Sequence, residues 1–92
     1  MNFSEFEIIQ KIKKSTTTIR RYESELAKQE KLSAGNQLLA QRLGLDKDAE
    51  TQSLRASEEA TVNSMRTKLA EMKAAHNKFV QDHGYSSELL LE

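Results

Sequence analysis

The 92-residue sequence predicts an all-α protein, built as a long antiparallel two-helix hairpin of the coiled-coil type. Three observations predict this fold. Apolar residues recur at alternating spacings of three and four, which is the pattern of a helix packed along one stripe. The chain contains no proline, so no residue forces either stretch to stop. The tripeptide Gly44-Leu45-Asp46 separates two stretches of nearly equal length, as expected for neighbouring antiparallel helices.

The first helix is expected over residues 4–43. Ser4 is suited to be its N-cap, and Glu7 stands three residues later, in the arrangement of a capping box. Gly35 weakens the middle of this stretch by about 1 kcal/mol relative to alanine. One continuous helix with a bend and two helices joined by a kink are therefore both open, and the lack of proline favours continuity.

The joint between the helices is expected at residues 44–46. Gly44 can adopt the left-handed conformation that ends many helices, and Leu45 would be the apolar residue that follows it in a Schellman ending. Asp46 would then be the N-cap of the second helix, because its carboxylate can accept hydrogen bonds from the first turn. The sequence therefore predicts a tight helix-to-helix turn at this point.

The second helix is expected over residues 47–83, where Gly84 and Tyr85 repeat the glycine-apolar ending. Residues 1–85 then form one helical hairpin domain, and residues 86–92 form a C-terminal tail. The leucines of this tail have two open interpretations, docking on the helices or a partner and fraying. The last two residues also match the sequence that a cloning site leaves before a purification tag, so their origin is open as well.

The apolar stripe of each helix predicts the helix-packing interface. Antiparallel alignment places Ile19 near Leu69 and Met72, so an aspartate at Ile19 or Leu69 is expected to disrupt the packing. The predicted interface consists of Ile8, Ile12, Ile19, Tyr22, Leu26, Val62, Met65, Leu69, Met72, His76 and Phe79.

Nearer the joint, the apolar stripe of each helix is less regular. In the first helix, Leu38, Leu39 and Leu43 are expected to meet the start of the second helix. In the second helix, the stripe is expected to continue upstream of Val62 through small or apolar side chains. These are Leu54, Ala56 and Ala60.

A two-helix hairpin buries one stripe per helix and leaves its flanks uncovered, and small chains already bury a poor fraction of their surface. Apolar residues beside the stripe widen it toward what a bundle helix shows. These flanking residues are Phe6, Ile9, Leu39 and Val80. We therefore expect two hairpins to form a homodimeric four-helix bundle, while a helix of another protein and a self-sufficient monomer are the alternatives.

Composition excludes several functions. Lysine plus arginine equals aspartate plus glutamate at 14 each, so no net charge draws the chain to nucleic acid or to anionic membranes. Cysteine is absent, which excludes disulfides and thiolate chemistry. No phosphate-binding glycine loop or helical His-Glu metal motif is present, so neither an enzyme nor a cofactor is expected. Without a signal-peptide pattern or an apolar run of membrane length, we expect the cytoplasm.

Two histidines lie near the end of the second helix. His76 and His83 stand seven residues apart, or about 10 Å along a helix, which is too far for one zinc ion. We interpret both as partly buried interface residues rather than metal ligands. Their protonation near pH 6 would then weaken the interface at this end.

A row of basic residues lies opposite the apolar stripe of the first helix. Lys14, Arg21 and Lys28 are spaced by seven, and such a row can contact phosphates. Glu25 interrupts the row and no aromatic residues are interleaved, so a solvated outer face is the favoured interpretation. A nucleic-acid-binding helical bundle that uses this face remains the alternative function.

The sequence thus predicts a small non-enzymatic protein-protein interaction module, of the kind used as adaptors, chaperones or regulators. It would act through helix packing, with itself and another protein as its expected partners. Fold class alone does not identify that other protein.

Overall fold

The computed structural model describes residues 4–85 and 89–92, and within these ranges it contains two helices and no strand. Helix α1 spans Glu5–Arg42 and α2 spans Ala49–Asp82. The all-α prediction with two helices is confirmed. Helix α1 passes through Gly35 without a break, which decides between the two interpretations of that stretch in favour of continuity.

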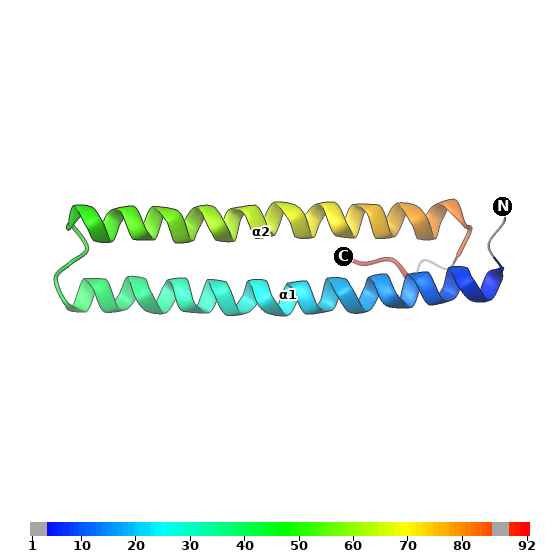
Figure 1. The fold of residues 1–92 in the computed structure, drawn as a ribbon, viewed down its shortest axis with the longest axis horizontal. Helices are drawn as coiled ribbons and strands as arrows, with labels where there is room; N and C mark the ends of the chain where they lie inside the picture. The colour runs from blue at the N-terminus through cyan, green and yellow to red at the C-terminus, as the bar shows by residue number, and fades with distance from the viewer. Residues whose placement is uncertain (1–3, 86–88) are drawn as a thin grey trace. The chain divides into compact units, whose positions relative to one another are not determined.

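Helices α1 and α2 are drawn in Figure 1. Both contribute to two compact units, which we describe separately. The terminal unit comprises Met1–Glu23 and Lys68–Glu92, and the turn unit comprises Ser24–Thr67. Each unit therefore contains one segment of α1 and one segment of α2. The chain ends belong to the terminal unit, and the joint between the helices belongs to the turn unit.

At both ends of α1, backbone groups that the helix leaves unpaired form hydrogen bonds at the residues expected to cap it. The Ser4 hydroxyl oxygen accepts a hydrogen bond of 3.3 Å from the backbone N–H of Glu7. At the other end Gly44 adopts a φ of 71°, the left-handed conformation that glycine reaches at little cost. The backbone N–H of Leu45 donates to the carbonyl of Ala40 at 2.8 Å, which is the long hydrogen bond of a Schellman motif.

The start of α2 differs from the sequence expectation. The helix begins at Ala49, two residues after the expected start at Lys47. The N-cap is Asp48 rather than Asp46, because its Oδ2 atom accepts hydrogen bonds from the backbone N–H and the hydroxyl of Thr51, both at 3.0 Å. Both aspartates are good caps, so residue type does not distinguish them.

A further turn explains the shift. The backbone N–H of Asp48 donates to the carbonyl of Leu45 at 3.0 Å, which closes a turn between the glycine ending and the new cap. The joint therefore spans residues 43–48 rather than the expected 44–46. Leu45, within this joint, is 44% exposed.

Helix α2 ends as α1 does, with a glycine in the left-handed conformation. Gly84 has a φ of 69°, and the backbone N–H of Tyr85 donates to the carbonyl of Val80 at 3.1 Å. The last helical residue is Asp82, one before the expected end. The glycine-apolar pattern in the sequence thus marks the ending of both helices.

In the terminal unit the two helix segments are antiparallel. The ammonium of Lys11 lies 4.6 Å from the ring centre of Phe79. The ammonium of Lys68 lies 5.7 Å from the ring centre of Tyr22. A later residue of α1 thus contacts an earlier residue of α2, as antiparallel helices require. Four side chains are buried between the segments: Ile12, Ile19, His76 and Val80.

The segments of the turn unit are antiparallel as well. Glu30 pairs with Arg66 at 3.6 Å, and the Asn36 amide donates to the Glu58 carboxylate at 3.1 Å. The buried hydrophobic side chains of this unit are also three, but on the whole they are smaller: Leu26, Ala40 and Val62. The turn unit therefore buries little apolar surface between its own helices.

Candidate protein-interaction surfaces

The residues predicted to form the helix-packing interface all face inward within their own unit. None of the eleven is exposed. In the terminal unit these are Ile8, Ile12, Ile19, Tyr22, Leu69, Met72, His76 and Phe79, and in the turn unit Leu26, Val62 and Met65. They form the seam between the two helix segments of each unit.

His76 forms the polar centre of the terminal seam. It is 4% exposed, and its ring nitrogen Nε2 lies 2.9 Å from the carbonyl oxygen of Leu89. A carbonyl can only accept, so Nε2 carries the hydrogen and Nδ1 accepts from the Ser15 hydroxyl at 2.8 Å. Ser15 stands at a position of α1 where the apolar pattern skips a step, and this hydrogen bond accounts for the exception.

The second histidine does not belong to the seam. His83 is exposed, and its Nδ1 atom lies 2.8 Å from the Phe79 carbonyl of its own helix. The expectation of two interface histidines is therefore wrong for His83. The low-pH hypothesis stays a prediction.

The described end of the tail is held by α2. The Asn77 amide nitrogen donates to the carbonyl of Leu91 at 2.7 Å, and the backbone N–H of Leu91 donates to the Asn77 amide oxygen at 2.7 Å. Together with the contact from His76, these hydrogen bonds hold Leu89 and Leu91 to α2. Of the two interpretations of the tail, docking applies to these residues, whereas residues 86–88 lie outside the described ranges.

Replacing Asn77 with alanine is expected to release the end of the tail. Both hydrogen bonds to Leu91 are lost, and because each contributes about 1 kcal/mol, protection of the Leu91 amide from hydrogen exchange should fall by tenfold or more. The exposed neighbour Lys78 offers a matched alanine control that should leave this protection unchanged. Equal protection in both variants would show that the tail is held by other contacts.

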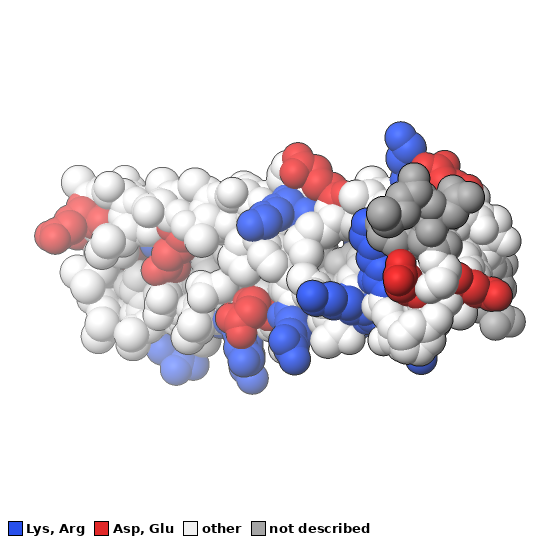
Figure 2. Space-filling view, turned by 45° about the vertical axis from the view of Figure 1, so that its right-hand side comes forward, with Lys and Arg blue, Asp and Glu red and all other residues white. Residues whose placement is uncertain are grey.

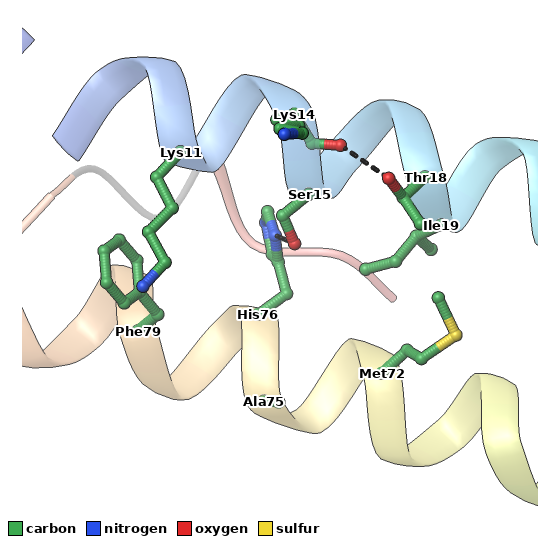
Figure 3. A pocket seen from close by; sticks show the side chains of 9 residues that line it. All are labelled: Lys11, Lys14, Ser15, Thr18, Ile19, Met72, Ala75, His76 and Phe79. Atoms are coloured by element: carbon green, nitrogen blue, oxygen red, sulfur yellow. Dashed lines mark hydrogen bonds between the residues drawn. The ribbon is translucent and has the colours of Figure 1, made fainter. Parts of the chain in front are cut away.

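An open cavity of about 530 Å³ lies between the two helix segments of the terminal unit, and we call it the terminal groove (Figure 3). Its apolar floor includes Ile19 from α1 and Met72 and Phe79 from α2, and the first two point toward each other. Lys11 and Lys14 stand at its rim, and Lys11 reaches across to the ring of Phe79. The volume lies within the range of surface sites that bind other molecules.

The polar groups in the wall of the terminal groove are already paired. The hydroxyl of Ser15 is bonded to His76, and the hydroxyl of Thr18 donates to the backbone carbonyl of Lys14 at 3.0 Å. A molecule in the groove would therefore meet mainly apolar carbon, with lysine ammonium groups along one side. Such a surface suits an apolar side chain accompanied by a carboxylate.

The seam of the turn unit is polar, which the sequence did not lead us to expect. Upstream of Val62, the inward residues of α2 are Glu58, Arg55 and Thr51, at heptad spacing. The side chains expected there are exposed instead: Leu54, Ala56 and Ala60. The heptad register of the well-patterned stretch continues unchanged and brings charged residues inward.

Two atoms of this polar seam lack a hydrogen-bond partner among the described residues. Oε1 of Glu58 accepts from Asn36, but Oε2 is buried without a partner, and so is Nη1 of Arg55. A buried polar atom that makes no hydrogen bond costs about 1–3 kcal/mol. The interior of the turn unit is therefore weakly stabilising at best.

The leucines of the turn unit point outward. Leu38, Leu39 and Leu43 were expected to meet the start of α2, but they are 48%, 55% and 63% exposed. The expectation is wrong because the inward positions of α1 run at intervals of seven through Leu26 to Ser33 and Ala40. The leucines stand beside these positions rather than in them.

Three of the exposed leucines share one side of the turn unit. Leu32 and Thr61 line the same cavity, so these two positions of α1 and α2 lie on one side. Leu39 stands seven residues after Leu32, and Leu54 stands seven residues before Thr61, which places both on that side. We call Leu32, Leu39 and Leu54 the leucine face; they are 59%, 55% and 62% exposed.

Charged groups are few near the turn on one side of the molecule. The face drawn in Figure 2 shows mainly uncharged atoms at its left, where the turn lies. White in that view marks polar as well as apolar residues, so the candidate rests on the three leucines, whose exposed apolar side chains share one side of the turn unit. The leucine face is therefore the first candidate interaction surface, and the terminal groove is the second.

The basic row of the alternative hypothesis is solvent-exposed. Lys14 and Arg21 lie on the surface of the terminal unit, and Lys28 lies on the surface of the turn unit. Lys28 pairs with Glu25 at 3.5 Å, so part of its charge is offset by its own helix. The nucleic-acid hypothesis stays a prediction.

Other kinds of site are not found in the part of the chain that the structure describes. No group of three His, Cys, Asp or Glu residues in the ranges 4–85 and 89–92 is placed to hold a metal ion. Neither described helix has the length and apolarity that crossing a membrane requires. No protein-family model, curated protein or solved structure matches the chain.

Proposed function

We propose that this chain is a non-enzymatic protein-protein interaction module, and that its first partner is a second copy of itself in a four-helix bundle. The proposal rests on the turn unit, in which charged side chains face inward and leucines face outward. Its seam contains Glu58 and Arg55 with unpartnered buried atoms, whereas the leucine face is more than half exposed. A sequence that places leucines outside and charges inside is better matched to an assembly than to an isolated hairpin.

The apolar surface is large enough to matter for association. Complete burial of a leucine side chain stabilises by about 1.5–3 kcal/mol, and the three leucines of the face are a little over half exposed. Covering them in both copies would contribute about 5–11 kcal/mol, which is comparable to the cost of bringing two chains together. We therefore expect a dimer whose population depends on protein concentration.

The same surface also suits a helix of another protein, which would make the chain an adaptor, a chaperone or a regulator. An amphipathic helix recognises such a surface through apolar side chains one helical turn apart. Self-association would then be the resting state that a partner displaces. This heteromeric form of the proposal uses the same leucines, so one variant tests both.

Replacing Leu39 with glutamate is expected to abolish self-association. The wild-type mass in sedimentation equilibrium should rise with concentration, whereas the variant should remain a monomer. Its helicity should be unchanged, because Leu39 is 55% exposed and supports little of its own unit. The measurement requires circular dichroism on the same samples to confirm that helicity is retained.

Gln37 provides the control. It is exposed, stands two residues before Leu39, and belongs to the other side of the turn unit, where it lines a different cavity with Glu30 and Arg66. Gln37→Glu introduces a similar charge and should associate as the wild type does. A wild-type chain that is monomeric at every concentration, or a Leu39→Glu variant with wild-type mass, would overturn the proposal.

A further inference from the structure

We propose that the leucine face of one copy docks into the terminal groove of a second copy. This inference rests on the proposed self-association and adds the identity of the receiving surface. In a twofold dimer the contact occurs twice, once in each direction. Each chain then supplies one set of leucines and one groove.

The spacing of the two surfaces agrees. Leu32 and Leu39 are seven residues apart on α1, which separates them by about 10.5 Å along the helix. Met72 and Phe79 in the groove floor are also seven residues apart on α2, at the same separation. Two leucines one heptad apart can therefore enter the groove together as knobs between the side chains of its floor.

The chemistry of the groove also agrees. Its floor is apolar and the polar groups of its wall are bonded to one another, so it favours hydrocarbon side chains. Beside the leucine face, Glu50 is exposed and stands one helical turn before Leu54. Its carboxylate complements the lysines at the rim, of which Lys14 is exposed.

The alternative is direct packing of two leucine faces on each other. That contact would cover the leucines but would leave the apolar floor of both terminal grooves in water. The exchanged contact covers both features in both chains, so it buries more apolar surface for the same loss of freedom on association. The two arrangements make opposite predictions about variants of the groove.

Blocking the groove should abolish association as effectively as removing the leucines. Ala75 lines the groove and is exposed, so Ala75→Glu fills the groove without removing a buried contact. The exposed neighbour Ala74 lies outside the groove lining, and Ala74→Glu is the matched control. Lys14→Glu, at the rim, is a second groove variant that confirms the result if Ala75→Glu loses helicity.

Mixing a groove variant with a leucine variant tests whether the leucines of one chain bind the groove of the other. Ala75→Glu chains retain the leucine face and Leu39→Glu chains retain the groove, so each variant should be monomeric alone while the equimolar mixture associates. One of the two contacts remains in the mixed dimer, so its dissociation constant should exceed the wild-type value by about tenfold or more. Sedimentation of each variant alone and of the mixture measures this.

The outcomes separate the two proposals. A wild-type chain that never associates overturns the proposed function itself. A wild-type chain that associates while both groove variants also associate normally leaves the proposed function standing and overturns the groove as the receiving surface. Monomeric single variants whose mixture also remains monomeric overturn the exchanged arrangement, because leucines and groove would then be needed in the same chain.

Discussion

Replacing Ile19 with aspartate is expected to unfold the terminal unit. Ile19 is 1% exposed and lies at the centre of the seam, between Met72 and the His76 network. Removing its side chain costs about 2–5 kcal/mol as a buried cavity, and an uncompensated buried carboxylate adds to that loss. Because small domains have total stabilities of about 5–15 kcal/mol, this single change removes most of the folding free energy.

Urea unfolding followed by circular dichroism measures the effect. The comparison should be made at a concentration where the wild type is monomeric, so that association does not contribute. Leu38→Asp is the matched control: Leu38 lies on the same helix, is 48% exposed and does not belong to the leucine face. We expect it to change stability by less than about 1 kcal/mol. Similar losses in both variants would mean that Ile19 is not the centre of the core.

The terminal unit is the part of the fold that the sequence predicts best. Ile12 and Ile19 in α1, and Met72 and Phe79 in α2, repeat at heptad spacing and face inward. Here the apolar pattern and the helix register agree, so either one identifies the seam. Both helix endings were predicted for a similar reason, because a glycine followed by an apolar residue specifies a local backbone geometry that does not depend on the rest of the fold.

The turn unit is predicted poorly because its pattern and its register disagree. The register of α1 is set by Ile19 and Leu26, and seven residues further on it reaches Ser33 and then Ala40. Sequence reasoning followed the leucines instead, since apolar residues are normally buried. A strict count from the well-patterned half would have placed Glu58 inward. The exposed leucines are informative because they depart from the usual rule.

No pattern in the sequence predicts that the tail binds to α2. Asn77 binds the backbone of Leu91 through its amide, and this interaction depends on the path of the tail rather than on any side-chain period. The hydrogen bond between Ser15 and His76 could be predicted only in part. Both positions follow from the heptad, but the hydrogen bond between them requires the relative placement of two helices, which one-dimensional spacing does not supply.

Replacing the polar pair Asn36 and Glu58 with two leucines is expected to stabilise the turn unit. The pair meets across the seam at 3.1 Å, and the second carboxylate oxygen of Glu58 is buried without a partner. The double variant removes that unpartnered oxygen and adds apolar contact between the helices. Exchanging a poorly satisfied buried polar group for hydrocarbon is often stabilising, and we expect a gain of about 2–3 kcal/mol in the free energy of unfolding.

The single variant Asn36→Leu should lower the free energy of unfolding, whereas the double variant should raise it. Asn36→Leu alone leaves the Glu58 carboxylate beside a leucine, without the hydrogen bond that Asn36 donates to it. Losing this solvent-exposed hydrogen bond costs about 0.5–1.5 kcal/mol, so the single change should destabilise where the double change stabilises. Urea midpoints of the wild type, both single variants and the double variant form a cycle that measures this coupling. A double variant less stable than the wild type would show that the polar seam is better satisfied than its hydrogen bonds indicate.

The same double variant separates stability from association. Glu58 faces inward, and Asn36 is exposed and lines one cavity with Leu32, but the three leucines of the leucine face are themselves unchanged. If the leucines act as a docking surface, the dissociation constant of the double variant should stay within about threefold of the wild-type value while its unfolding midpoint rises. If instead the leucines are exposed only because the polar seam holds the helices apart, the double variant should draw them inward and weaken association. The direction of that change therefore decides whether the exposed leucines serve a partner or merely result from a poor interior.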